Sequence, residues 1–335
     1  MEPVTHLLAS YTLARAARTR VFSPRMAVFL CAGTACDLDW FFRLPPPVSA
    51  LRAYGTAAHS LVGAGALAGA IGLAGWAAAR KNHRQKTPLG TTLAAAFAAA
   101  AVHLLLDLSS NTGIELFWPL RGMRVAWNLA GNFEGILLSV LAACALLPGL
   151  FSLVTEEIGA QTDTRPGRGW PLAALSLVVL DLGLRAFLHG RAEDLLGAAR
   201  FQDATPRRWA AYPAGLSPFT WRGVAETDSS LVEVEVPVAL GGAFDPQRAS
   251  IRFKPEASPA LDAAAATSLA RAYTALARFP AASVEQGAEG MHVELRELGD
   301  SLLHTSGGTW LASIDLDAQT KVTHQELYWM PSRSQ

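Results

Sequence analysis

The sequence predicts an α-helical multi-pass membrane bundle followed by a small α+β domain. The 335 residues are on average 51% hydrophobic and only 17% charged, but the composition divides sharply near residue 190. Long apolar runs fill the chain before that point, and polar segments with alternating patterns follow it. We therefore assign residues 1–190 to a membrane-embedded bundle and residues 191–335 to a soluble domain.

Four apolar runs before residue 190 are long enough to cross a hydrocarbon core as helices. Three of them contain no Lys, Arg, Asp or Glu, and they cover residues 57–79, 87–106 and 135–155. The fourth run, residues 169–190, contains Asp181 and Arg185. Their i,i+4 spacing lets the two charges neutralise each other within a membrane helix, so this run is also predicted to span.

The first 42 residues contain two apolar segments that are too short to be predicted as spans on their own. They are expected to form a helical hairpin packed against the longer helices. Basic residues follow the first apolar stretch and do not precede it, which is not the pattern of a cleaved signal peptide. We therefore expect this segment to be retained.

Two clusters of basic residues predict the orientation of the bundle in an inner, or plasma, membrane of the bacterial type. The clusters are Arg15, Arg18, Arg20 and Arg25, and then Arg80, Lys81, Arg84 and Lys86. Connections rich in Lys and Arg face the cytoplasm. Alternate crossings then place the soluble domain on the non-cytoplasmic side, provided that the N-terminal hairpin counts as two crossings. If it does not cross, His6 lies on the wrong side of the membrane.

His103 and Asp107 stand near the end of the second long apolar run, four residues apart. Residues with this spacing share one face of a helix, so an imidazole nitrogen and a carboxylate oxygen can approach one cation. Ionisable groups inside a membrane segment are candidates for function. The alternative is a neutral histidine that forms a hydrogen bond with its neighbouring carboxylate inside the bundle.

Further histidines and aspartates reach the same membrane level when the chain is threaded alternately. The predicted metal ligands are His6, Asp37, His59, His103 and Asp107, with Asp39 as a further carboxylate. This mixture of nitrogen and oxygen donors suits Zn²⁺, with Mn²⁺ and Fe²⁺ as alternatives, better than Cu(I) or Ca²⁺. The set allows either one metal with supporting partners or a two-metal site.

Four segments in sequence order carry a family resemblance. They are PVTHLLASYTLA at the start, AGTACDLDWFF at 32–42, AAHSLVGAG at 57–65 and VHLLLDLSSNTGIELFWPL at 102–120. Together they resemble the inner-membrane metal-dependent hydrolase family, also called the LexA-binding, inner-membrane-associated hydrolases. The resemblance covers residues 3–155, and YPAGLSPFTWRGV looks like the tail segment of longer members. It departs at YGTAAHS, where Tyr54 and Gly55 stand in place of the histidine and arginine of the family's HRGxTHS.

The resemblance implies hydrolysis similar to that of zinc-dependent phospholipases C and nucleases. A bound metal with an open position would lower the pKa of a coordinated water to about 7 and supply hydroxide for attack on an ester or phosphoester. Asp39 and Asp107 are the predicted catalytic carboxylates, the spare one acting as general base. Arg121 and Arg124 are predicted to bind an anionic part of the substrate, unless they are ordinary loop arginines at a lipid surface.

The region after residue 190 predicts strands and one helix. SLVEVEVPVAL places the valines at 232, 234, 236 and 238 on one face, as in a half-buried strand. Residues 261–279 read as an amphipathic helix, and 291–298, 309–317 and 321–329 as further strands. We expect one small α+β domain from this pattern.

Three functions remain open from the sequence. The first is a membrane-bound metal-dependent hydrolase of a phosphoester or ester, with lipids as partners and as a substrate class. The second is a non-catalytic membrane anchor with a structural metal or polar network that presents a C-terminal binding domain. The third is transport of a metal or small polar solute. The sequence contains no Gly-rich phosphate loop, no GxSxG motif and no basic groove with interleaved aromatics, so no nucleic-acid partner is indicated.

Overall fold

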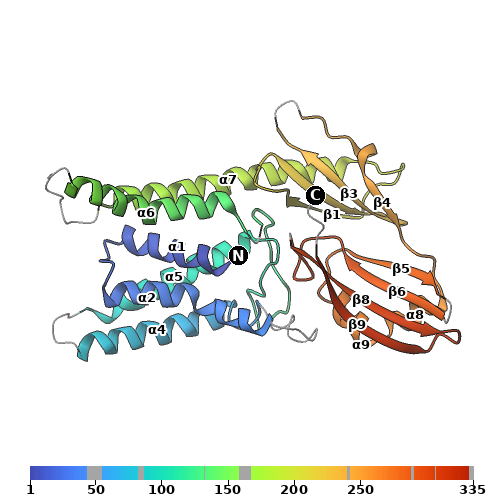
Figure 1. Ribbon diagram of the computed structural model, residues 1–335, viewed down its shortest axis with the longest axis horizontal. Coiled ribbons are helices and arrows are strands. Elements are labelled where there is room, and N and C mark those ends of the chain that lie inside the picture. The colour runs from blue at the N-terminus through green and yellow to red at the C-terminus, as the bar shows by residue number, and fades with distance from the viewer. Residues whose placement is uncertain are drawn as a thin grey trace. The chain divides into compact units, whose positions relative to one another are not determined.

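The computed structural model describes residues 1–43, 55–81, 87–131, 133–157, 167–239, 242–287, 290–305 and 307–331. Tyr54, Arg84 and Lys86 of the sequence predictions lie outside these ranges. The chain divides into two compact units (Figure 1). The first contains residues 1–41, 55–127 and 133–184, and the second contains mainly residues 185–331, so the boundary falls within one long helix.

Helices build the first unit. They are α1 (Pro3–Ala16), α2 (Pro24–Thr34), the 3₁₀ helix η1 (Ala35–Arg43), α4 (Leu61–Lys81), α5 (Leu89–Ser109), α6 (Gly135–Glu157) and α7 (Gly169–Ala198). Among the described residues, α4, α5, α6 and α7 are long and apolar enough to cross a membrane. This confirms the predicted multi-pass bundle. The hairpin helices α1 and α2 have only 14 and 11 residues, and whether they cross stays a prediction.

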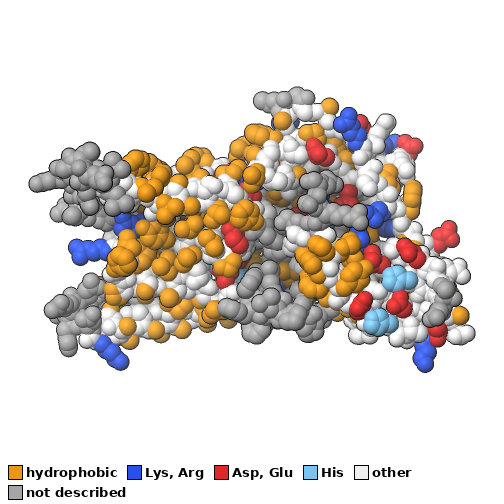
Figure 2. Space-filling model, viewed as in Figure 1, with side chains coloured by type: hydrophobic (Ala, Val, Ile, Leu, Met, Phe, Trp, Pro, Cys, Tyr) orange, Lys and Arg blue, Asp and Glu red, His pale blue; other side chains and the backbone are white. Residues whose placement is uncertain are grey.

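The surface of the helical unit is apolar, as a membrane protein requires. Large hydrophobic side chains are exposed along α6 and α7, and Figure 2 shows them as orange side chains over these helices. They include Leu146, Leu150, Phe151, Leu177, Val179 and Leu180. In water such a surface would be an aggregation hazard, whereas in lipid it is the expected exterior.

α5 is the central helix of this unit, because it packs against α1, α2 and α4. Within its apolar window 44% of the residues are buried, against 17%, 17% and 28% for the other three candidate spans. Small side chains at Ala95, Ala96, Ala99 and Ala100 are buried and allow this close packing. The polar residues of α5 therefore face protein and not lipid.

The second unit contains two antiparallel sheets. The first sheet has the order β1 (Arg208–Pro213), β2 (Thr220–Glu226), β3 (Ser230–Pro237), β4 (Ser250–Phe253). Its buried face packs against the C-terminal part of α7 through Leu188, Leu196 and Trp221. Val232, Val234 and Val236 of β3 are buried there, which confirms the predicted alternation.

The second sheet is covered by two short helices, α8 (Pro259–Ala265) and α9 (Ser268–Thr274). Its strands are β5 (Pro280–Gln286), β6 (Gly290–Glu297), β7 (His304–Thr305), β8 (Gly308–Asp317) and β9 (Val322–Pro331). Their order is β5-β6-β8-β7, and β9 also pairs with β8. The predicted single helix over 261–279 was wrong. Thr267 interrupts it by accepting a hydrogen bond from Ala270 N and starting α9 as a new helix.

Candidate metal centre

His103 and Asp107 lie on the inner face of α5, within the last two turns before the helix ends at Ser109. His103 Nδ1 lies 2.8 Å from the carbonyl oxygen of Gly33 on α2. A carbonyl can only accept, so Nδ1 carries the proton and Nε2 keeps its lone pair. That Nε2 lies 3.2 Å from Asp107 Oδ2. The hydrogen bond to Gly33 thus fixes the tautomer that a metal ligand needs.

His59 is held by the turn that precedes α4. Ser60 starts this helix, because its Oγ accepts a hydrogen bond from Gly63 N at 2.9 Å. His59 Nδ1 lies 3.0 Å from Asp39 Oδ2, and the same oxygen accepts a hydrogen bond from Gly55 N at 3.0 Å. His59 Nε2 then lies 3.2 Å from Asp107 Oδ2. Asp39 therefore orients the ring, and the Nε2 atom points at the same carboxylate as that of His103.

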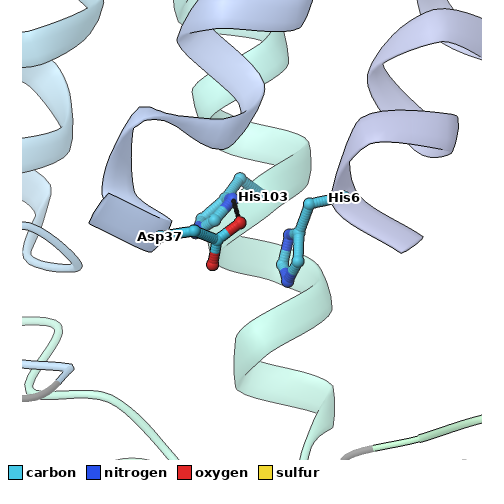
Figure 3. Close-up of side chains that lie close together, drawn as sticks. All are labelled: His6, Asp37 and His103. Atoms are coloured by element: carbon cyan, nitrogen blue, oxygen red, sulfur yellow. Dashed lines mark ion pairs between the residues drawn. The ribbon is translucent and has the colours of Figure 1, made fainter. Parts of the chain in front are cut away.

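His6 comes from the first turns of α1. Its ring centroid lies 3.9 Å from that of His103, and its Nε2 lies 3.2 Å from Asp107 Oδ1. Asp37 of η1 places Oδ2 3.9 Å from His103 Nδ1. Figure 3 shows His6, Asp37 and His103 close together although they come from three different elements. The amino group of Met1 lies 2.5 Å from Asp107 Oδ1 and completes the surroundings of this carboxylate.

Asp107 is the common point of the cluster, since the Nε2 atoms of three histidines each lie 3.2 Å from one of its oxygens. Two sets of donor atoms lie within 4.8 Å of one another, and His103 belongs to both. The sets are His6, Asp37 and His103, and His59, His103 and Asp107. All five predicted ligands therefore meet in one buried place, with Asp39 beside them.

Several polar atoms of this cluster are buried without a hydrogen bond of good geometry to any described residue. They are Nδ1 and Nε2 of His6, Nε2 of His103, and one oxygen each of Asp37, Asp39 and Asp107. Leaving such groups unpaired costs about 1–3 kcal/mol each. Donor atoms that converge without well-formed hydrogen bonds are the arrangement that a cation would complete, and their nitrogen and oxygen chemistry fits a divalent ion.

The electrostatics of the cluster are those of three buried carboxylates among imidazoles. Burial raises the pKa of Asp37 to about 6. Burial also acts to lower the pKa of His59, but its contacts with Asp107 and Asp39 outweigh this and raise the pKa to about 9. The carboxylates of Asp107 and Asp39 therefore favour positive charge on His59.

The two predicted substrate arginines have different surroundings. Arg124 donates a hydrogen bond from Nη1 to the carbonyl oxygen of Gly113 at 2.9 Å. Its guanidinium also lies beside Gly55, the residue whose N–H binds Asp39. Arg121 is exposed to the surroundings. Arg124 is thus part of the framework around the cluster, whereas Arg121 is free to meet a ligand from outside.

The comparison with known families shows which family the chain belongs to. Residues 1–192 match the model of the YdjM inner membrane protein family. The chain belongs to this family. The match confirms the resemblance predicted from the four sequence segments, and it covers the helical unit and every residue of the cluster. No curated protein and no solved structure gives a match.

The family match and the four candidate spans establish an integral inner-membrane protein. The groups that sequence reasoning missed are mainly backbone atoms. The carbonyl of Gly33 and the N–H of Gly55 hold His103 and Asp39, and no residue-type signal marks such groups. The one available signal is glycine itself. Gly33 lies where α1 and α2 touch, since a Cβ there would meet Ser10 Oγ at 1.8 Å.

Proposed function

We propose that the chain is a membrane-bound metal-dependent hydrolase that cleaves a phosphoester or ester. The single observation that carries the proposal is the convergence of three histidine Nε2 atoms on Asp107, with unpaired donor atoms around it. A buried polar cluster of this kind gives a membrane bundle no packing advantage over apolar side chains. Membership of an inner-membrane family agrees with the location but does not by itself specify a reaction.

The residues that would hold the ion are His6, Asp37, His59, His103 and Asp107. Zn²⁺ is the preferred ion, with Mn²⁺ and Fe²⁺ as alternatives, because imidazole and carboxylate donors suit all three. When bound, such an ion supplies Lewis acidity and lowers the pKa of a water molecule to about 7. The two donor sets of the cluster share His103, whose single free lone pair at Nε2 can bind only one ion.

The chain's own residues divide the remaining tasks. Asp39 uses Oδ2 to hold His59 and Gly55, while its Oδ1 is buried without a hydrogen bond among the described residues. That second oxygen can accept a proton from the attacking water, which is the role of a general base. Asp107 fixes the three imidazoles about one point. Arg121, which is exposed, provides a positive charge for an anionic substrate group.

A second candidate function is a non-catalytic anchor, in which the cluster holds a structural metal or a polar network. The observation that favours it is the second unit, because residues 193–331 add two sheets beyond the family match. In this case the C-terminal domain would bind a partner on the non-cytoplasmic side. A saturated metal shell without hydrolysis would favour this alternative over the hydrolase.

Elemental analysis of the detergent-purified protein tests the site. The test variant is His103→Ala, Asp107→Ala, and the matched control is His292→Ala, Asp315→Ala. The control pair also brings a His Nδ1 within 2.6 Å of an Asp oxygen, but it lies on the second sheet. We expect stoichiometric Zn, Mn or Fe in the wild type and the control, and none in the test variant.

Turnover of phosphoesters and lipid esters is then measured on the same preparations, after each variant has been checked for folding. Hydrolysis should disappear with the metal in the test variant and persist in the control. Activity retained by His103→Ala, Asp107→Ala would refute the hydrolase proposal. Metal binding without any hydrolysis would favour the non-catalytic anchor function.

A further inference from the structure

The connection between α5 and α6 exposes an unusual number of large apolar side chains. Within residues 117–127 these are Phe117, Trp118, Leu120, Met123 and Trp127, and Leu120 is 86% exposed. The segment belongs to the helical unit and lies outside the candidate spans. Exposed apolar side chains in such a continuous group mark a surface that contacts something other than water.

Two backbone hydrogen bonds fix the level of this connection in the membrane. Leu61 N, at the first residue of α4, donates to Leu116 O at 3.0 Å. Trp127 N donates to Leu108 O, in the last turn of α5, at 2.7 Å. The connection is therefore attached at both sides to the ends of two candidate spans. Its apolar side chains lie where those spans leave the hydrocarbon, which is the level at which Trp side chains are enriched.

The cluster around Asp107 lies close to this connection, at the last two turns of α5. Asp107 and His103 are two and six residues before the end of α5 at Ser109. At a rise of about 1.5 Å per residue, they lie roughly 3 and 9 Å along the helix from its end. With the end of α5 taken as the edge of the hydrocarbon, both residues lie within about 9 Å of the headgroups. A soluble substrate would have to reach this depth from water, whereas a lipid phosphate ester is already close to it.

We propose that residues 116–123 lie in the bilayer interface and that the substrate of the centre is the phosphate ester of a membrane amphiphile, whose chains stay in the lipid. Arg121 stands in the middle of this segment and is exposed, so a cation accompanies the apolar side chains at the level of lipid phosphates. The substrate part of this inference rests on the proposed hydrolase function. The position of the segment does not.

A spin label tests the position in the full-length protein, reconstituted in phosphatidylethanolamine and phosphatidylglycerol vesicles. The label is placed at Leu120→Cys in a Cys31→Ser background, because Cys31 is the exposed thiol and Cys36 and Cys144 are buried. The same label at Phe253→Cys, an exposed position of β4 in the second unit, is the reference. Collisions with oxygen, which partitions into lipid, are compared with collisions with a water-soluble nickel complex.

The ratio of collisions with oxygen to collisions with the nickel complex should be clearly higher for the label at position 120 than for the label at position 253. An equal ratio at the two positions would overturn the interfacial placement. Low collision with both reagents would mean that protein covers the segment, and this would overturn it too. The background without an introduced cysteine should take up no label.

Two substrates test the second half of the inference, namely phosphatidic acid in vesicles and water-soluble para-nitrophenyl phosphate. The variant Leu120→Asp, Met123→Asp should lose about tenfold or more of its rate on the lipid while changing little on the soluble ester, because membrane contact scales with buried apolar area. Phe253→Asp is the matched control and should change neither rate. Equal losses on both substrates, or no loss on the lipid, would overturn the lipid assignment.

If the wild type hydrolyses no phosphate ester but does hydrolyse a carboxylic ester, the substrate assignment falls and the proposed hydrolase function stands; if it hydrolyses neither class, both fall together. The collision measurement still decides whether residues 116–123 enter the bilayer.

Discussion

Replacement of Asp39 by alanine should weaken metal binding without removing a predicted ligand. Asp39 Oδ2 receives both His59 Nδ1 and Gly55 N at 3.0 Å. Without it, the His59 ring loses the group that fixes its tautomer and direction, and Gly55 loses its acceptor inside a buried turn. Loss of such a supporting carboxylate typically costs about 10–100-fold in metal affinity, or about 1.4–2.7 kcal/mol.

The variant Asp39→Asn separates the effect of hydrogen-bond geometry on metal affinity from the effect of the carboxylate charge. Because both donors meet the same carboxylate oxygen, the amide oxygen of asparagine can accept both of them. We therefore expect a loss of about tenfold or less for Asp39→Asn and a loss nearer to 100-fold for Asp39→Ala. The control is Asp245→Ala, which also removes a carboxylate that accepts a backbone N–H, but at the short helix Pro246–Arg248 of the second unit.

The assay is competition for Zn²⁺ between the detergent-purified protein and a fluorescent chelator, with folding checked by thermal unfolding. Wild type and Asp245→Ala should compete equally. Unchanged affinity in Asp39→Ala would refute the orienting role. A larger loss in Asp39→Asn than in Asp39→Ala would refute the argument that geometry dominates.

Two further predictions concern packing and pH. Gly33→Ala should destabilise the helical unit by about 1–3 kcal/mol and weaken metal binding, because its Cβ would meet Ser10 Oγ at 1.8 Å and displace the carbonyl that holds His103. Gly65→Ala is the control and should be tolerated, because its Cβ would only touch Phe97 at 4.0 Å. Equal unfolding temperatures for the two variants would contradict this prediction. Burial raises the pKa of Glu297 from 4.5 to about 7. The folded C-terminal domain then binds this proton more tightly than the unfolded chain, so its stability should fall by up to about 3 kcal/mol as the pH rises from about 4.5 to about 7. Hydrogen exchange of the β6 amides at both ends of this window measures the change, and Glu297→Gln should flatten it.

The membrane part of the fold could be predicted because the length and composition of apolar runs are sufficient to identify spans. All four predicted runs are helices, and only their boundaries moved. The run predicted from residue 57 begins as a helix at Leu61, since Ser60 caps it and the preceding turn is needed to hold His59. The hydropathy pattern does not reveal this helix start, because alanines occur in the turn as well as in the helix.

The C-terminal domain was predicted less completely, for a physical reason. β3 and β6 each bury mainly one face, and alternation reveals them. β4 and β5 at the edges of the two sheets are mostly half-buried or exposed, so their sequences carry little alternation, and they were not predicted. The same limit applies to the candidate metal centre. Spacing and topology predict that the candidate ligands lie close together, whereas they do not predict the backbone groups that orient these side chains.

The position of Asp107 supports the proposal that this cluster binds a cation, against the alternative of a structural polar network. A structural network is favourable when each buried group has its own partner. Here the Nε2 atoms of three histidines approach one carboxylate, while other nitrogens and oxygens beside it have no hydrogen bond among the described residues. His59 and His103 nevertheless each have Nδ1 held firmly, by Asp39 and by Gly33. The chain thus fixes the far side of both rings, while His103 Nε2 and both ring nitrogens of His6 have no well-formed hydrogen bond among the described residues, which is the arrangement that an added cation would satisfy.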